Sequence, residues 1–137
     1  MIYLTRRERF SAAHRMYKAE LSDEENYKLF GQCSNPEWHG HNYILYVTVR
    51  GELKEDDGYL MNLKKLKEII SIYILEPLDH KNLNTQVAFM KGKLASTENI
   101  AIAIWDQLES KIKNEGAELY CVKIAETENN FIEYYGK

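Results

Sequence analysis

A segment that is apolar on both of its faces most constrains how this chain can fold. Residues 40–51 have the composition of a β-strand, in which successive side chains point to opposite sides. Tyr43 and Leu45 would occupy one side of that strand, and Ile44 and Tyr46 the other. Strands that are hydrophobic on both sides occur in sheets that are covered by helices or by a partner. We therefore expect both faces of this strand to be covered.

The remaining segments predict three more strands and two helices. The strands are expected at residues 3–14, 118–126 and 131–135, and the amphipathic helices at 63–75 and 97–113. The last two strands would form a hairpin. The order ββααββ indicates an α+β fold with an antiparallel sheet, in a single domain that spans residues 1–137. Four strands leave two open edges, so we expect the chain to oligomerise through them.

The helices carry signals for their ends. Asn62 is a suitable N-cap for the first helix, Leu63 and Leu66 would lie on its apolar face, and Glu76-Pro77 is expected to end it. Ser96 or Thr97 would cap the second helix, whose apolar residues recur every four positions at Ile100, Ile104, Leu108 and Ile112.

Residues 15–38 form a long, polar connection between the first two strands. A helical turn capped by Ser22 is expected within it. A connection of this length inside a compact domain usually has a function.

Composition excludes some classes of function. The net charge of −3 argues against a nucleic-acid binder, which usually carries a basic patch. No apolar run approaches the roughly 20 residues that span a bilayer, and the N-terminus has no apolar core of a secretion signal. We therefore expect a cytoplasmic protein with no membrane partner and with Cys33 and Cys121 reduced. Cys121 lies in a predicted strand and is expected to be a small packing residue.

Three of the four histidines lie at places compatible with a metal site. His39 and His41 are two residues apart on a predicted strand, so their rings would share one face, and His14 ends the preceding strand. Two paired strands could bring the three imidazoles together. Three imidazoles with an open fourth position are typical of a catalytic zinc, although two histidines on a strand are also common on a solvated face.

Two further groups could move protons or hold a ligand. Asp79 and His80 follow the end of the first helix, and adjacent residues do not normally face each other, so a turn-forming aspartate is the ordinary interpretation. With Cys33 they could instead form a thiol–imidazole–carboxylate set. Glu126 ends a predicted strand, where it could be a surface acid or could bind an amidine-like edge through two parallel hydrogen bonds.

Taken together, these segments resemble the 6-pyruvoyltetrahydropterin synthase family. Seven motifs in register carry the resemblance through nearly the whole chain: Phe10-Ser11-Ala12-Ala13-His14-Arg15, Leu21-Ser22-Asp23-Glu24-Glu25-Asn26, Leu29-Phe30-Gly31-Gln32-Cys33, His39-Gly40-His41-Asn42-Tyr43, Pro77-Leu78-Asp79-His80-Lys81-Asn82-Leu83, Ser96-Thr97-Glu98-Asn99 and Glu126-Thr127-Glu128-Asn129-Asn130.

The resemblance implies an architecture and a reaction. The architecture is the tunnelling fold (T-fold), in which ββααββ subunits form trimers that close a twelve-stranded barrel and two trimers stack as a homohexamer. The reaction is a lyase reaction of tetrahydrobiopterin synthesis, the conversion of 7,8-dihydroneopterin triphosphate to 6-pyruvoyl-tetrahydropterin with loss of triphosphate. It is an internal redox reaction and needs no nicotinamide.

The resemblance also implies roles for single residues. His14, His39 and His41 would bind Zn²⁺, and Cys33 would be the general base. Asp79 and His80 would complete the proton relay across a subunit interface. The Glu126 carboxylate would anchor the pterin, in a pocket lined by Ser96, Thr97 and Glu98. The triphosphate needs cations, for which Arg15, Lys18 and Lys81 are candidates.

The chain departs from the family at one motif, which leaves alternatives open. Five residues separate Cys33 from His39, the spacing typical of the pyruvoyl synthases and longer than in the relatives that make 6-carboxytetrahydropterin. Trp38, however, replaces a common glycine, and Glu37 precedes it. Other relatives use a glutamate before His-x-His to cleave the side chain to 6-hydroxymethyl-7,8-dihydropterin. A non-catalytic zinc and pterin binder is the alternative of another class.

Overall fold

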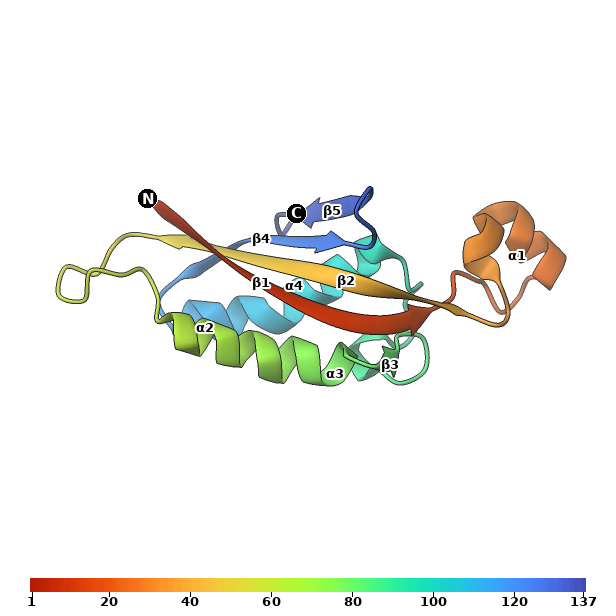
Figure 1. Cartoon of the computed structure of the whole chain (residues 1–137), viewed down its shortest axis with the longest axis horizontal. Helices are drawn as coiled ribbons and strands as arrows, with labels where there is room; N and C mark the ends of the chain where they lie inside the picture. Colours follow the sequence, from red (N-terminus) through yellow and green to blue (C-terminus); the bar gives the residue numbers. More distant parts are fainter.

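A computed structural model describes all 137 residues and contains the expected order of strands and helices. The elements are β1 (Ile2–His14), α1 (Asp23–Phe30), β2 (His39–Gly51), α2 (Leu63–Ile70), α3 (Glu76–Leu78), β3 (Lys81–Asn82), α4 (Thr97–Asn114), β4 (Glu118–Ala125) and β5 (Phe131–Tyr134) (Figure 1). The prediction of an α+β chain with order ββααββ is confirmed, with β3 as an additional short strand.

The sheet has the order β3-β1-β2-β4-β5. All neighbours are antiparallel except β3, which runs parallel to β1 at Ala12 and Ala13. The prediction of four strands with two open edges is therefore wrong at one end of β1, because β3 covers that end. The two residues of β3 are too few to give a recognisable strand alternation in the sequence. The rest of the β1 edge stays open within the chain.

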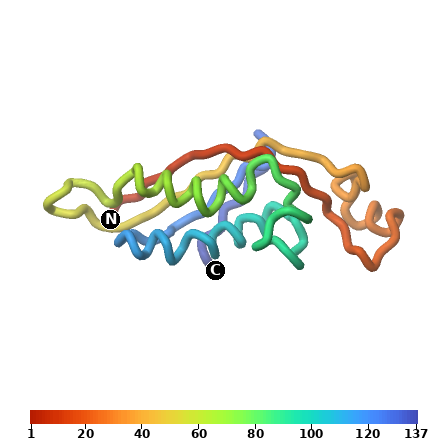
Figure 2. Tube along the Cα trace, turned by 90° about the horizontal axis from the view of Figure 1, so that it is seen from below, coloured from red at the N-terminus to blue at the C-terminus, as the bar shows by residue number.

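Helices α2 and α4 lie side by side on one face of the sheet (Figure 2). Alternate residues of β2 face them, and Tyr43, Leu45, Val47 and Val49 have no exposed surface. Ile44 and Tyr46, on the other face, are only half-buried. Within one chain the expected burial of β2 is thus found on one face only, because both long helices pack on the same side.

The first long helix differs from its prediction in two respects. Asn62 caps it as expected and accepts hydrogen bonds from two backbone N–H groups, but Leu63 is exposed and lies off the buried face. Glu76-Pro77 does not end the helical path, which continues through a π-helical turn (Ser71–Leu75) into α3. The wider turn already departs from regular α-helical bonding before the proline, whose missing N–H is tolerated in the first turn of a helical segment.

Helix α4 agrees with its prediction. The Ser96 hydroxyl caps it by accepting a hydrogen bond from the Asn99 N–H, and its period-four residues Ile100, Ile104, Leu108 and Ile112 are fully buried. The cap places Thr97 and Glu98 at the end of the helix that faces the histidines. None of the helices is both long enough and apolar enough to cross a membrane.

Candidate metal centre and ligand pocket

The pairing of β1 with β2 brings the three histidines together. His14 is the register partner of His39, and His41 is the partner of Ala12 on the same face. The ring centroid of His14 lies 4.4 Å from that of His39 and 5.1 Å from that of His41. The ring centroids of His39 and His41 are 4.9 Å apart. One ring nitrogen from each residue lies within 4.8 Å of the other two. The group could therefore hold one metal ion.

The nitrogens that converge are free to bind it. His14 Nε2, His39 Nδ1 and His41 Nε2 are buried and make no hydrogen bond. His14 Nδ1 is 2.7 Å from the Ala95 carbonyl oxygen. A carbonyl can only accept, so Nδ1 carries the proton and the Nε2 lone pair is left for the centre. Burial lowers the pKa of all three imidazoles, which favours the neutral form that binds metals.

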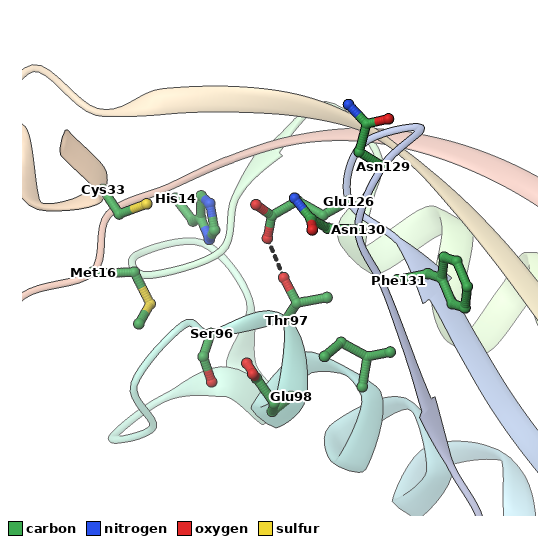
Figure 3. A pocket seen from close by; sticks show the side chains of 11 residues that line it. His14, Met16, Cys33, Ser96, Thr97, Glu98, Glu126, Asn129, Asn130 and Phe131 are labelled. Atoms are coloured by element: carbon green, nitrogen blue, oxygen red, sulfur yellow. Dashed lines mark hydrogen bonds between the residues drawn. The ribbon is translucent and has the colours of Figure 1, made fainter. Parts of the chain in front are cut away.

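Glu126 forms the neighbouring wall. It follows the last residue of β4, and its backbone N–H donates to Asn130, which closes the turn into β5. The Thr97 hydroxyl, in the first turn of α4, donates a hydrogen bond to one carboxylate oxygen (Figure 3). The other oxygen is 3.4 Å from His41 Nε2. The carboxylate is thus held in place between the helix and the histidines.

A cavity of about 510 Å³ joins these groups. Side chains from four separate segments line it, and Figure 3 shows those of His14, Met16, Cys33, Ser96, Thr97, Glu98, Glu126, Asn129, Asn130 and Phe131. The volume suits a small bicyclic ligand, and most of the lining side chains are polar. The structure therefore brings the predicted residues Ser96, Thr97, Glu98, Glu126 and Cys33 to one pocket beside the histidines.

Cys33 lies at the mouth of this cavity, in a 3-10 turn (Gly31–Ser34). Its thiol is exposed, and it also lines a second cavity of about 660 Å³ together with His39 and His41. The turn is attached to the end of β1, because the Met16 N–H donates to the Cys33 carbonyl at 2.8 Å. Cys121, in contrast, is buried in β4, as predicted.

Arg15 holds the same turn. Its Nε donates to the Ser34 carbonyl at 2.7 Å, its guanidinium pairs with Asp23 at 3.1 Å, and it stacks 4.1 Å from the Tyr17 ring centroid. The Arg15 side chain is almost fully buried by these contacts. Arg15 was a candidate for binding triphosphate, but its guanidinium is engaged in supporting the Cys33 turn.

Asp79 and His80 do face each other. His80 Nδ1 is 3.0 Å from Asp79 Oδ1, and His80 adopts a left-handed backbone conformation with φ of 60°. Asp79 also accepts the Ser11 N–H at 2.8 Å, and this hydrogen bond lowers the pKa of its carboxyl group. The His80 side chain is 82% exposed and lines another cavity with Lys81 and Asn42. Within one chain no hydrogen bond joins this pair to Cys33.

Two features of the region were not predicted. Tyr43 has a buried hydroxyl without a hydrogen-bond partner, and burial raises the pKa of its phenol. Its position two residues after His41 on the same strand was the available signal. Met16 lines the cavity from the start of the long connection.

Glu37, the residue on which the alternative of side-chain cleavage depends, is exposed and lines none of the cavities around the histidines.

Comparison with known proteins gives consistent matches over the whole length. Residues 3–137 match the family model described as 6-pyruvoyl tetrahydropterin synthase. The chain is 51% identical over 136 residues to the 6-pyruvoyl tetrahydrobiopterin synthase of Dictyostelium discoideum, covering 99% of this chain and 97% of that one. It is 49% identical over 134 residues to the human protein of that name, covering 98% and 91%. The Caenorhabditis elegans 6-pyruvoyl tetrahydropterin synthase structure superposes with a TM-score of 0.91 at 40% identity, over 99% of this chain and 96% of that one.

Proposed function

The chain belongs to the 6-pyruvoyl tetrahydropterin synthase family, and on that premise we propose that it is the enzyme that converts 7,8-dihydroneopterin triphosphate to 6-pyruvoyl-tetrahydropterin and triphosphate. One observation carries the proposal. Three unpartnered imidazole nitrogens, a carboxylate held by Thr97 and an exposed thiol lie around two cavities that share Cys33 as a lining residue.

Zn²⁺ is the metal we assign to His14, His39 and His41. Three neutral nitrogen ligands fit a catalytic zinc, which keeps one position open. When bound, the ion would supply Lewis-acid chemistry that polarises side-chain hydroxyls of the substrate and acidifies the adjacent carbon. His41→Ala should lose stoichiometric zinc, whereas His80→Ala should keep it. Undiminished zinc in His41→Ala, measured by elemental analysis, would refute the assignment.

Glu126 would anchor the pterin. A pterin presents a 2-amino group and a neighbouring ring N–H on one edge, and a carboxylate can accept both in parallel. The Thr97 hydroxyl and the turn at Asn130 hold this carboxylate at the cavity wall. Ser96 and Glu98 line the same cavity and would contact the ring or its side chain.

Cys33 would act as the general base. A thiolate at the mouth of the cavity can take a proton from a substrate side-chain carbon that reaches toward the histidines. His80, oriented by Asp79, would move the other protons. Because His80 lines a cavity that Cys33 does not line, we propose that a neighbouring subunit supplies the Asp79–His80 pair.

The assembly we propose is the trimeric barrel of the T-fold, stacked as a hexamer of single-domain subunits. Its support is the sheet face that neither helix covers, where Ile44 and Tyr46 remain half-buried, and the edges that β1 and β5 leave open. Closure of strands from three subunits would pair those edges and enclose that face.

Lys81 is the cation we propose for the triphosphate. No lysine or arginine lines either cavity that contains Cys33, and the Arg15 guanidinium is engaged elsewhere. Lys81 lines the His80 cavity, so the neighbouring subunit that supplies the relay would also supply this charge.

Product analysis tests the proposal. The zinc-loaded protein is incubated with 7,8-dihydroneopterin triphosphate, and the pterins and released phosphates are identified by mass spectrometry. We expect triphosphate and a 6-pyruvoyl product, and near-complete loss of turnover in Cys33→Ala with zinc retained. A 6-hydroxymethyl or 6-carboxy product would instead assign one of the related reactions, and tight binding without any product would indicate a binding protein.

A further inference from the structure

Four buried polar side-chain atoms in the chain have no hydrogen-bond partner, and all four lie together. They are His14 Nε2, His39 Nδ1, His41 Nε2 and the Tyr43 hydroxyl. Buried polar groups are nearly always hydrogen-bonded, because leaving one unpaired costs free energy. A metal ion would account for the three nitrogens. It does not by itself account for the hydroxyl.

Tyr43 is fixed beside the histidines. Its ring stacks on Phe10 from the paired strand, with centroids 4.9 Å apart and planes inclined by 14°. The ring centroid lies 5.5 Å from that of His41 and 6.1 Å from that of His14, edge to face in both cases. Tyr43 lies on the same face of the sheet as His14 and His41, and its hydroxyl is buried there without a hydrogen-bond partner.

A phenol at neutral pH is both a donor and an acceptor, whereas a neutral imidazole nitrogen with a free lone pair only accepts. The Tyr43 hydroxyl makes no hydrogen bond to the histidines, and their lone pairs are needed by the metal. Its partner is therefore a group that shares the site with the ion.

We propose that Tyr43 is a positioning residue of the metal centre, whose hydroxyl donates a hydrogen bond to the non-protein oxygen that completes the coordination beside His14, His39 and His41. With the metal bound, that oxygen would be that of water in the resting protein and that of a substrate hydroxyl during turnover. The inference rests on the proposed metal site and adds a fourth protein group to it. Groups in this position orient and polarise the ligand that they contact.

Tyr43→Phe tests the inference, because it keeps the ring and its stack on Phe10 and removes only the hydroxyl. Tyr46→Phe is the matched control, since Tyr46 lies on the same strand with its side chain on the opposite face. Four quantities are measured for each protein: the Zn²⁺ dissociation constant by competition with a chelating dye, the thermal unfolding midpoint without metal, kcat and KM.

We expect Tyr43→Phe to bind Zn²⁺ about 10- to 100-fold more weakly and to lose kcat by a similar factor. Its metal-free unfolding midpoint should stay equal to wild type or rise, because an unpaired buried hydroxyl has been removed. KM should change less than kcat. Tyr46→Phe should match wild type in zinc affinity and turnover.

Two results would overturn the inference while the metal site stands. One is zinc affinity and kcat that both stay within about twofold of wild type. The other is a metal-free protein that loses stability in step with zinc affinity, which would mean a structural role only. If wild type itself binds no Zn²⁺, the metal assignment fails first and the inference fails with it.

Discussion

His41 Nε2 lies 3.4 Å from Glu126 Oε1, so the metal-binding histidines and the carboxylate of the pocket are direct neighbours. The pairing of Ile44 with Ala125 produces this proximity, because it sets the end of β4 beside the histidine end of β2. The Thr97 hydroxyl holds the other carboxylate oxygen, which leaves Glu126 oriented before any ligand arrives. A pterin bound to Glu126 would therefore lie directly beside the metal-binding histidines.

Glu126→Gln should separate ligand binding from metal binding. A glutamine amide is uncharged and has only one oxygen, so it cannot accept two parallel N–H hydrogen bonds as a carboxylate does. Hydrogen bonds to a charged group contribute about 1.5–3 kcal/mol. We expect affinity for a pterin, followed by its fluorescence, to fall roughly 10- to 100-fold with zinc content unchanged. Glu128→Gln, in the exposed part of the same turn, is the control and should bind normally. Loss of zinc in Glu126→Gln alone would show that Glu126 is a metal ligand.

The stability of the metal-free protein should fall as the pH drops below the pKa of an ordinary histidine. Burial lowers the pKa of His14, His39 and His41 in the folded state, while the unfolded chain keeps a value of about 6.5. The unfolded state then binds more protons below that pH, so stability is full above it and is lost toward the lower folded-state values. Thermal unfolding between about pH 7.5 and pH 5.5 measures this loss.

One variant identifies the source of this pH dependence. His14→Gln should flatten the decline, since it removes one of the buried imidazoles. An unfolding midpoint that is flat across the interval would contradict the shifted pKa values.

Local sequence patterns were sufficient for the long strands and for α4, and they were insufficient for the two-residue strand β3 and for the contacts between elements. Alternation and period-four spacing predicted the strands and α4, since each signal is contained within one element. The register that sets His14 opposite His39 depends on two strands together, so the metal site could be suspected from the sequence but not placed.

The residues that were predicted poorly have partners that are distant in the chain or conformations that are rare. The sequence made Arg15 a candidate cation for the triphosphate, because its acceptor, the Ser34 carbonyl, is supplied by a folded turn. His80 contacts Asp79 and has a positive φ, a backbone conformation that few histidines adopt. The unpaired hydroxyl of Tyr43 becomes visible only once burial and hydrogen bonds are known.

Arg15→Met should destabilise the protein and disturb Cys33. The Ser34 backbone carbonyl would lose its buried donor, and such a loss costs about 1–3 kcal/mol. We expect a lower unfolding midpoint, together with faster alkylation of Cys33 by a thiol reagent as the turn loosens. Lys81→Met is the contrasting variant: its midpoint should match wild type, while KM for the triphosphate substrate rises. The reverse pattern in the two variants would reassign triphosphate binding to Arg15.

Mixing inactive variants tests whether the relay is assembled from two subunits. Cys33→Ala and His80→Ala should each be inactive alone. After they are unfolded and refolded together in equal amounts, an intact site forms where a His80→Ala subunit meets the His80 of a Cys33→Ala neighbour. Random assembly places such a pair at about a quarter of the sites, so activity should return to about that fraction of wild type.

The control is a mixture of Cys33→Ala with His41→Ala. It should stay inactive, because Cys33 and His41 border the same cavity of one chain and no site regains both. If native mass spectrometry shows mixed oligomers and the first mixture is still inactive, Cys33 and His80 must act within one subunit or not act together.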